Sequence, residues 1–516
     1  MTKIIKDLSF IFFPPSSRRG KRLKKIAIKF GLAKNFTFDY RYQFWIDNIE
    51  RYSFLDPIKD KKTKFSIVIP TYNTKSKYLE PLLYSIFNQS YDNFELIIGD
   101  ASDEQKTSDY IKSRLSNEPR ARYIKLKRNE GISANTNKCL ENVNGDWVVF
   151  VDHDDTLSLH ALNEAAAVIN EKPSVEIIYS DEDKLTEDGI YRHTPHFKPD
   201  WSPHQYLSCN WTSHLSMVKV ALVKKVGGLR PDFDGSQDYD LILRILSIPG
   251  KRNIEHIPKV LYHWRIAEGS TAGSVSSKSY AVVAGEKALD EYLTTNKINA
   301  RAVSIEDRPG FYRVKFNPDH KKKAIIVVGA SDDKLLNQSY INRLKDSNTS
   351  VAKAIFIHKK DFDHNKNKYL DKLRADDAIF FLNRAYSIKN TKWIDELCGV
   401  LSLEDVGAVM PKIISPDFRI EDMGIVLEEG KETTLFKNLH ENEGTIFGHT
   451  EWVRDVYKVS ESFSGTTKEN LYKRKNGLYE VVWSHITAVD LYIAKGKHNN
   501  YNPNIKIDEV SWAPRV

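Results

Sequence analysis

The sequence predicts an α/β protein whose N-terminal half is a doubly wound, mostly parallel sheet with flanking helices, followed by a second, smaller α/β domain. Three observations support this: strand-like runs alternate with helical patterns, the runs are continuously apolar, and polar clusters follow them. Such alternation is typical of parallel sheets buried on both faces. A chain of 516 residues with 41% hydrophobic and 28% charged residues is long enough for two or three cores.

The predicted elements begin with a helix over residues 40–52, which has an apolar stripe, and a charged linker follows at 60–64. Strands are expected at 65–70, 94–99, 122–126 and 147–151. Helices are expected at 78–88, 108–115, 132–141 and 157–170. Sheets of this kind bind ligands at the carboxyl ends of their strands, so the loops at those ends are the candidate site.

Three carboxylates, Asp152, Asp154 and Asp155, follow directly after the apolar run at 147–151. Like charges this close resist joint ionisation, and a hard divalent cation such as Mn²⁺ or Mg²⁺ would relieve the repulsion. The alternative is an ordinary polar turn in which Asp155 or Thr156 caps the next helix. Both interpretations remain open for this motif alone.

Polar residues also follow the other predicted strands. The first strand runs into residues 70–73, the second ends at 100–103, and the third is followed by 128–131 with Ser133 as a helix cap. Each segment alone is ordinary turn chemistry. Together with the acidic cluster, they describe a pocket able to hold a base, a ribose and a metal-bound diphosphate.

These motifs, in this order, resemble glycosyltransferase family 2, and the resemblance spans about residues 40–293. The matching segments are FSIVIPTYN at 65–73, the Asp100 turn, NEGISAN at 129–135, DHDD at 152–155, YSDEDK at 179–184, FKPDWSP at 197–203, GSQDYD at 235–240 and YHWR at 262–265. The resemblance implies the GT-A fold and transfer of a sugar from a nucleotide-sugar donor. It is greatest to the subgroup that builds bacterial O-antigens, capsules and related surface glycans, including rhamnosyltransferases.

The resemblance implies a role for each matching position. The nucleotide would be bound by Pro70, Thr71, Tyr72, Asn73, Asp100, Asn129, Gly131, Asp152 and Arg265. The metal, Mn²⁺ or Mg²⁺, would be held by Asp154, Asp152 and His263, and Asp100 would accept from a pyrimidine N–H. Ala101 stands where the family often has a second acidic residue, which puts that extra contact in doubt.

Asp238 matches the general base, which must take a proton from an acceptor hydroxyl as it attacks the anomeric carbon. Gln237 replaces the preceding acid and is able to orient the acceptor but not to act as a base. Asp240 is the rival carboxylate, and the motif register favours Asp238. Residues expected on the acceptor side are Asp181, Lys198, Asp200, Trp201, Trp211, His214 and Gln237.

The C-terminal part resembles a degenerate second module of the same family, on the strength of residues 406–412 and 424–427. Where an acidic metal motif should follow the strand at 377–382, the chain reads Asn383-Arg384-Ala385, and where a base should precede residues 489–491 it reads Thr487-Ala488. Residues 320–516 are therefore predicted to be an inactive GT-A-like domain that binds acceptor, first domain or partner. The alternative is activity through other residues, such as Asp332 and Asp333.

The remaining domains are predicted at 1–62, a basic helical segment with a linker helix, and at 63–300, the catalytic domain. The formal charge is only +8, and much of the basic excess lies at residues 18–29. That segment is either an amphipathic helix on an anionic membrane surface or a solvated helix packed on the main domain. No nucleic-acid-binding signature accompanies the charge.

Three widely spaced cysteines argue against a disulfide framework and favour a reducing cytosol, and no apolar run approaches the roughly 20 residues of a membrane span. The expected partners are a UDP- or dTDP-sugar donor and a glycan or lipid-linked glycan acceptor. The expected location is cytoplasmic, with possible peripheral contact at the inner face of the plasma membrane. The alternatives are a nucleotide-sugar-binding scaffold and a nucleotidyltransferase, and the lack of a Gly-rich phosphate loop ending in Lys argues against a P-loop enzyme.

Overall fold

The computed structural model describes residues 39–266 and 279–488, with short gaps at 307, 318–320, 330–333, 348–353, 385, 388–392, 416, 429 and 473–477. The predicted basic helix before residue 39, the pair Asp332 and Asp333, and residues 489–491 lie outside the described part. Across the described residues, no helix combines the length and the apolar character that a membrane crossing needs.

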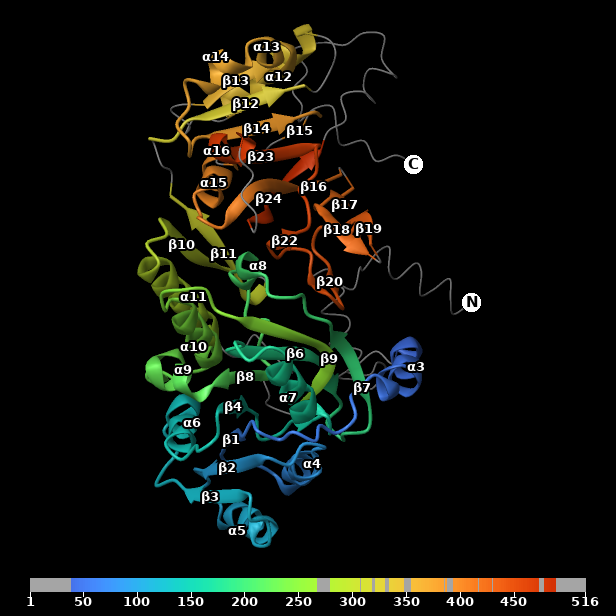
Figure 1. Cartoon of the computed structure of the whole chain (residues 1–516), viewed down its shortest axis with the longest axis vertical. Coiled ribbons are helices and arrows are strands. Elements are labelled where there is room, and N and C mark those ends of the chain that lie inside the picture. Colours follow the sequence, from blue (N-terminus) through green and yellow to red (C-terminus); the bar gives the residue numbers. More distant parts are fainter. Residues whose placement is uncertain are drawn as a thin grey trace. The chain divides into compact units, whose positions relative to one another are not determined.

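The chain divides into two compact units (Figure 1). Unit 1 contains Met1–Trp201, Thr212–Ser279 and Glu443–Gly448, and unit 2 contains Ser202–Trp211, Tyr280–Asn442 and His449–Val516. Each unit thus includes a short segment from the other half of the sequence. The domain limits at 63–300 and 320–516 remain predictions.

Unit 1 is built on one mixed sheet with the strand order β3-β2-β1-β4-β8-β6-β9-β5, and β7 pairs with β6. The strands are β1 (Phe65–Thr71), β2 (Phe94–Asp100), β3 (Ala121–Lys125), β4 (Trp147–Phe150), β5 (Thr156–Leu157), β6 (Ile177–Leu185), β7 (Arg192–His196), β8 (Ser216–Lys219) and β9 (Ile254–Arg265). The first four strands in this order pair in parallel, whereas β8 runs antiparallel to both neighbours. The predicted α/β fold class is therefore confirmed.

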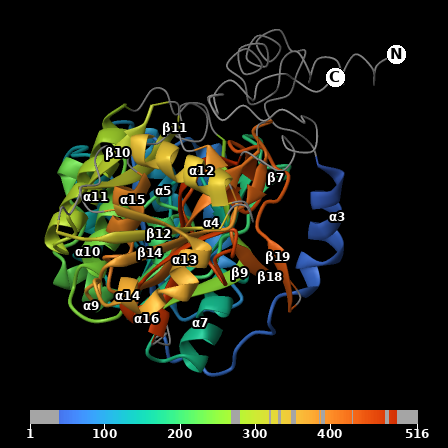
Figure 2. The same cartoon turned by 90° about the horizontal axis from the view of Figure 1, so that it is seen from above.

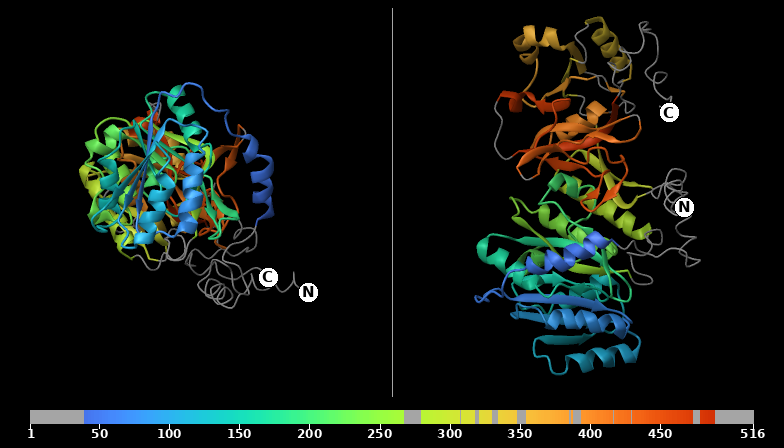
Figure 3. Two further views of the ribbon diagram at one scale, coloured as in Figure 1. Left: turned by 90° about the horizontal axis from the view of Figure 1, so that it is seen from below. Right: turned by 90° about the vertical axis from the view of Figure 1, so that its right-hand side faces the viewer.

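Helices cover both faces of this sheet, as Figures 1 and 3 show, and α3 lies beside β7 (Figure 2). The helices are α3 (Tyr40–Asn48), α4 (Ser76–Phe87), α5 (Gln105–Leu115), α6 (Ile132–Leu140), α7 (Ala161–Glu171), α9 (Val220–Lys225) and α10 (Gln237–Leu246), with short turns η1 (Glu50–Tyr52) and η2 (Pro231–Phe233). The helix predicted from residue 157 begins only at Ala161, because Thr156 and Leu157 pair with β9 as strand β5.

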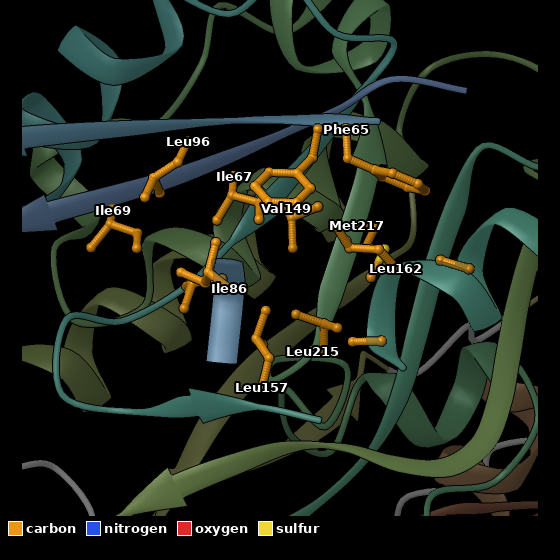
Figure 4. Close-up of a cluster of buried hydrophobic side chains, with 14 of the residues drawn as sticks. Phe65, Ile67, Ile69, Ile86, Leu96, Val149, Leu157, Leu162, Leu215 and Met217 are labelled. Carbon is orange, nitrogen blue, oxygen red and sulfur yellow. The ribbon is translucent and has the colours of Figure 1, made fainter. Parts of the chain in front are cut away.

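The core of unit 1 explains why the sequences of its strands are continuously apolar. Alternate residues of β1, namely Phe65, Ile67 and Ile69, pack with Ile86 of α4 and with Leu162 of α7 in one cluster (Figure 4). The intervening Val68 belongs to a second cluster on the opposite face. Each fully buried side chain of this size contributes about 1.5–3 kcal/mol, so both faces stabilise the sheet. A rigid sheet in turn fixes the loops at its carboxyl edge.

Unit 2 holds a second mixed sheet, with the strand order β13-β12-β14-β23-β16-β24-β15. The strands of this sheet are β12 (Ala324–Val328), β13 (Ala354–His358), β14 (Ala378–Leu382), β15 (Tyr386–Ser387), β16 (Val406–Ile414), β17 (Ile420–Asp422), β22 (Arg454–Val456), β23 (Phe463–Thr467) and β24 (Tyr479–Ala488). The helices are α8 (Pro203–Tyr206), α11 (Ser279–Thr295), α12 (Lys334–Ser347), α13 (Lys359–His364), α14 (Lys366–Leu370), α15 (Trp393–Val400) and α16 (Lys468–Tyr472). Short strand pairs join β10 (Ala300–Ile305) to β11 (Arg308–Phe316) and β18 (Ile425–Glu428) to β19 (Lys431–Thr434). The segment Glu443–Gly448 of unit 1 contains β20 (Gly444–Thr445) and the start of β21 (Gly448–His449).

The sheet of unit 2 repeats the topology of unit 1 apart from β3. Strands β13, β12, β14, β23, β16, β24 and β15 take the places of β2, β1, β4, β8, β6, β9 and β5, in the same chain order. The pairing directions also agree, with antiparallel β14–β23 and β23–β16, parallel β16–β24 and antiparallel β24–β15. The prediction of a second α/β domain of the same kind is confirmed.

This correspondence corrects one detail of the sequence alignment. Thr487 and Ala488, expected at the position of a base, lie in β24, and their pairing with β15 makes them the counterparts of Tyr262 and His263 of β9. Among the described residues, the helix between β23 and β24 is α16, which follows β23 directly as α9 follows β8 in unit 1. The sequence alone misaligned this segment because no motif marks the end of β23.

A buried charge cluster in unit 2 gives a prediction about stability. His204 of α8 is buried, with Nδ1 at 2.7 Å from Asp455 Oδ1 and Nε2 at 3.3 Å from Asp405 Oδ1. Burial alone would lower the pKa of His204, but the two carboxylates outweigh it and raise the pKa from 6.5 to about 10. A raised pKa stabilises the fold fully below pH 6.5, and this contribution is lost as the pH rises through about 10.

We therefore expect His204→Gln to lower the free energy of unfolding by about 3–5 kcal/mol at pH 6, because it leaves the buried carboxylate of Asp455 without its cation. Urea titrations at pH 6 and pH 10.5 measure the effect. The difference between wild type and variant should shrink at the higher pH, and a difference that is independent of pH would contradict the charged state of His204.

Candidate active site

Strands β1, β2 and β4 pair in parallel, so the loops that follow them meet at one edge of the sheet of unit 1. The acidic loop after β4 lies there. The Asp152 side chain is 42% exposed, Asp154 is half-buried and Asp155 is fully buried. Strand β9 reaches the same edge through its pairing with β5, and it supplies the partners of this loop.

Asp155 anchors the acidic loop to β9. Its Oδ2 accepts a hydrogen bond of 2.6 Å from the Tyr262 hydroxyl, and its Oδ1 accepts one of 2.7 Å from the Arg265 backbone N–H. Burial, followed by the nearby charges of Asp154 and Asp152, raises the pKa of Asp155 well above its ordinary value. Asp155 is therefore not a helix cap, and a cation at this loop would offset the repulsion among the three carboxylates.

His214 is the imidazole that the structure places at this loop. Its Nε2 lies 3.9 Å from Asp152 Oδ2, and its ring stacks on Tyr262 with ring centroids 4.8 Å apart. Burial lowers the pKa of His214 to about 4, so the ring is neutral at pH 7 and its unprotonated nitrogen is available to a metal. The sequence analysis placed His214 on the acceptor side.

Among the described residues, Asp152, Asp155 and His214 form a group able to hold one cation, since a ligand atom from each lies within 4.8 Å of the others. Carboxylate and imidazole are suitable ligand types for Mn²⁺, and the carboxylates also suit Mg²⁺. The donor set therefore fits the predicted divalent metal. Asp154, expected as the main ligand, stands outside this group, and its Oδ1 lies 3.8 Å from His153 Nδ1.

The structure does not place His263 at the metal loop. Side chains alternate along β9, so His263 points to the face opposite Tyr262, and its Nδ1 lies 2.7 Å from Asp183 Oδ1. Asp183 also accepts hydrogen bonds from the Tyr42 hydroxyl and Arg192 Nε. The structure thus brings His214, and not His263, to the acidic loop, and the metal role of either histidine remains a prediction.

Arg265 is also committed to the protein. It is buried, and its Nε donates a hydrogen bond of 2.6 Å to the Asp154 backbone carbonyl, while Nη1 donates to the Glu187 carbonyl at 3.2 Å. These contacts hold the acidic loop in place. Its Nη2 is buried without a partner among the described residues, so nucleotide binding by Arg265 remains a prediction.

The loops after β1 and β2 are joined by hydrogen bonds. Tyr72 is exposed, and its hydroxyl donates to Asp103 Oδ2 at 2.7 Å. Asn73 Oδ1 accepts from the backbone N–H groups of Asp103 and Glu104, which precede α5. Pro70 and Thr71 end β1, and Thr71 is buried. The exposed ring of Tyr72 is therefore presented on a rigid pair of loops.

Asp100 is buried and already has protein partners. Its carboxylate accepts hydrogen bonds from the Ser102 N–H, the hydroxyls of Ser108 and Tyr123, and Lys125 Nζ. Burial would raise the pKa of Asp100, but the hydrogen bonds outweigh it and lower the pKa to about 2. A nucleobase N–H would have to displace one of these donors, so nucleoside binding by Asp100 remains a prediction.

The loop before α6 depends on Asp234, a residue that the sequence analysis missed. Gly131 precedes α6 with φ of 95°, and a Cβ at this position would collide with the Asp234 carboxylate. Asp234 Oδ1 accepts a hydrogen bond of 3.1 Å from the Ser133 N–H at the start of the helix. Asn129 Oδ1 accepts from the Gly131 N–H at 3.2 Å and orders the same turn.

The two candidate bases have different environments. Asp238 is half-buried in the first turn of α10, where its Oδ1 accepts from the Tyr239 N–H at 2.9 Å. Asp240 is buried, and its carboxylate pairs with the guanidinium groups of Arg230 and Arg244. Asp240 is therefore a structural ion-pair residue. Gln237 Oε1 accepts from the Gly235 N–H at 2.7 Å and shapes the turn before the helix.

The residues expected on the acceptor side do not form one surface. Asp181 is buried and accepts from the Lys198 N–H and from His256 Nε2, whereas the Asp200 side chain is 97% exposed. Lys198 Nζ donates to the backbone carbonyls of Ser213 and His214. These contacts give Asp181 and Lys198 structural roles.

The two tryptophans also differ. Trp201 is half-buried at the end of one segment of unit 1. Trp211, expected on the acceptor side, is buried in unit 2, where it packs edge-to-face on Tyr206 at 5.7 Å as a core residue. The sequence did not separate these cases because buried and sugar-stacking aromatic residues have the same pattern.

The sequence of the acidic-loop region matches a known protein family. The family model for glycosyl transferase family 2 matches residues 66–225, a span that includes β1, β4, the acidic loop and His214. Residues 66–225 form a glycosyltransferase family 2 domain. The family 2 domain therefore contains the whole group Asp152, Asp155 and His214.

Two relatives extend the similarity beyond the family 2 domain. An O-antigen biosynthesis protein, RfbC from Myxococcus xanthus, is 30% identical over 78% of this chain and 33% of its own length. An uncharacterized protein, y4gI from Sinorhizobium fredii, is 28% identical over 85% of this chain and 52% of its own length. The chain thus spans about a third and about half of these relatives.

Among solved structures, the mannosyltransferase PcManGT from Pyrobaculum calidifontis, in complex with GDP-Man and Mn²⁺, is 16% identical, with a TM-score of 0.35. The similarity covers 50% of this chain and 70% of that protein.

Proposed function

We propose that this chain is a metal-dependent inverting glycosyltransferase, which moves a sugar from a nucleoside-diphosphate sugar to a hydroxyl of a growing bacterial surface glycan. The observation that carries the proposal is the grouping of Asp152, Asp155 and His214 at the carboxyl edge of a family 2 domain. That edge is where ligands of such sheets bind.

Asp152 and His214 would hold the metal, with Asp155 beneath them and Asp154 on the same loop. The chemistry supplied by the bound ion is neutralisation of the negative charge that develops on the departing diphosphate. Arg265 supports this step by fixing the Asp154 carbonyl, so the loop needs little reorganisation when the donor binds.

The donor nucleoside would lie against the loops after β1 and β2. The exposed Tyr72 ring offers a stacking surface, and the adjoining residues Pro70, Thr71 and Asn73 form the wall of this site. Asn129 and Gly131 border it from the turn before α6. We take a UDP- or dTDP-sugar as the donor class.

Asp238 would be the base. Its carboxylate takes the proton of the acceptor hydroxyl, whose oxygen forms a bond to the anomeric carbon from the side opposite the diphosphate. The bond from that carbon to the diphosphate oxygen breaks, so the product has the inverted configuration. The choice of Asp238 is supported by its place at the start of α10 and by the commitment of Asp240 to two arginines.

The O-antigen protein among the relatives supports a surface glycan, free or lipid-linked, as the acceptor class. A cytoplasmic protein with peripheral membrane contact through basic residues 18–29 would suit a lipid-linked acceptor. Unit 2 would be an inactive counterpart of the family 2 domain. Asn383, Arg384 and Ala385 stand between β14 and β15, where the counterpart loop of unit 1 carries the carboxylates.

Purified protein with Mn²⁺ or Mg²⁺ and a panel of nucleotide sugars tests this proposal. Release of a nucleoside diphosphate that depends on the metal and rises with acceptor glycan is the expected result. Release of pyrophosphate would indicate nucleotidyl transfer instead, and binding without any turnover would indicate a scaffold.

A further inference from the structure

Lys184 of β6 lies beside the candidate metal group but has no role in the function proposed above. It sits on the same face of the sheet as Tyr262 and Trp264, because Lys184 pairs with Trp264 in the parallel register of β6 and β9. Its ammonium lies 3.1 Å from the centre of the Trp264 ring. Trp264 in turn contacts the ring of His214, with centroids 4.8 Å apart.

The hydrogen-bonding state of Lys184 differs from that of its neighbour Lys198. Lys198 Nζ donates hydrogen bonds to the carbonyls of Ser213 and His214 at 2.8 and 2.6 Å and forms an ion pair with Glu182 Oε2 at 3.1 Å. Within the described part of the chain, the nearest acceptor of Lys184 Nζ is Glu182 Oε1 at 3.5 Å. The Lys184 ammonium therefore keeps donor capacity for a ligand.

The Glu182 carboxylate has a closer positive charge than that of Lys184, namely the ammonium of Lys198. Burial would raise the pKa of Glu182, but the charge of Lys198, followed by that of Lys184, lowers it to about 2. The closer ion pair is the one with Lys198, at 3.1 Å against 3.5 Å. A purely structural lysine at 184 would be expected to hold a full-strength hydrogen bond, which this one lacks.

The place and charge of Lys184 suit an anion at the metal group. Its side chain is 20% exposed, so the ammonium is not sealed in the core. The Trp264 ring holds the ammonium in place through a cation–π contact. A compact ammonium held in this way donates well to phosphoryl oxygens.

We propose that Lys184 binds the diphosphate of the nucleotide donor, whose negative charge it would share with a metal held by Asp152 and His214. This assignment rests on the proposed function, because it takes a nucleoside diphosphate as the ligand. It makes Lys184 a donor-binding residue and leaves Lys198 as a structural one.

Calorimetric titration with UDP, dTDP and uridine, in the presence of Mn²⁺, tests the assignment. Lys184→Gln should weaken the affinity for the diphosphates by about 10- to 100-fold and leave uridine binding unchanged, because only the diphosphate meets the ammonium. Lys184→Arg should recover part of the loss. The control is Lys172→Gln, since Lys172 pairs with Glu255 at 2.7 Å on the surface of unit 1, away from this loop.

Unchanged diphosphate affinity in Lys184→Gln would overturn the assignment. An equal loss of uridine and UDP binding would also overturn it, because it would indicate a structural defect. The assignment would also be overturned if Lys184→Gln bound UDP normally but needed more acceptor glycan for transfer. Wild-type protein that binds neither UDP nor dTDP would instead overturn the donor class of the proposed function.

Discussion

Replacing Asp238 by Asn is expected to lower sugar transfer by about 100- to 10,000-fold, the usual contribution of a general base. Asn keeps the size of the side chain and the oxygen that accepts from the Tyr239 N–H, but it does not take up a proton. Donor binding should remain largely intact. Transfer rates at saturating donor, together with calorimetric UDP affinity, separate the two effects.

Asp240→Asn provides the comparison, since Asp240 is two residues away on the same helix. Its carboxylate pairs with Arg230 and Arg244, so this substitution should lower the free energy of unfolding by about 3–5 kcal/mol. Urea denaturation measures this loss. Full transfer activity in Asp238→Asn would show that another group takes the proton.

Replacing His214 by Gln or Asp152 by Asn is expected to weaken Mn²⁺ binding by more than about 100-fold, because even outer partners of metal ligands are worth about 10- to 100-fold. Each change removes one ligand from the group that includes Asp155. Mn²⁺ affinity is measured by electron paramagnetic resonance titration, without substrate. Chelation of the metal should abolish transfer, and added Mn²⁺ should restore it.

His263→Gln is the matched comparison for His214→Gln. His214 stacks on the Tyr262 ring, and His263 follows Tyr262 in the chain. His263, however, points to Asp183 on the opposite face of β9. We expect the Mn²⁺ affinity of His263→Gln to stay within about threefold of wild type, within the ordinary context-dependence of such measurements. A large loss in His263→Gln with none in His214→Gln would restore the assignment made from the motif.

The sequence predicts the strands of unit 1 well, because β1, β2 and β4 are apolar runs buried on both faces. The local sequence at Thr156 and Leu157 predicts a helix cap and the first helical residue, and nothing local distinguishes it from the two-residue strand that the structure has there. Its pairing with β9, a hundred residues later in the chain, decides its conformation. Long-range pairing of this kind is not visible in local patterns.

The candidate site could be predicted only in part for a similar reason. The acidic loop follows from charge and position alone. The choice between His214 and His263 depends on which face of β9 meets the loop and on the left-handed turn at His214, where φ is 59°. The contrast between Lys184 and Lys198 likewise depends on carbonyl groups of residues 213 and 214. Strand register and loop conformation decide both the choice between the histidines and the contrast between the lysines. Local sequence patterns predict neither the register nor the loop conformation.

Diffraction from crystals of the protein with Mn²⁺ and UDP, recorded at a wavelength where manganese scatters anomalously, tests the metal-centred account most directly. The account predicts one manganese peak in contact with Asp152 and His214 and with the UDP diphosphate, with the uracil ring beside Tyr72. A manganese peak away from this loop, or a nucleotide bound elsewhere, would contradict it.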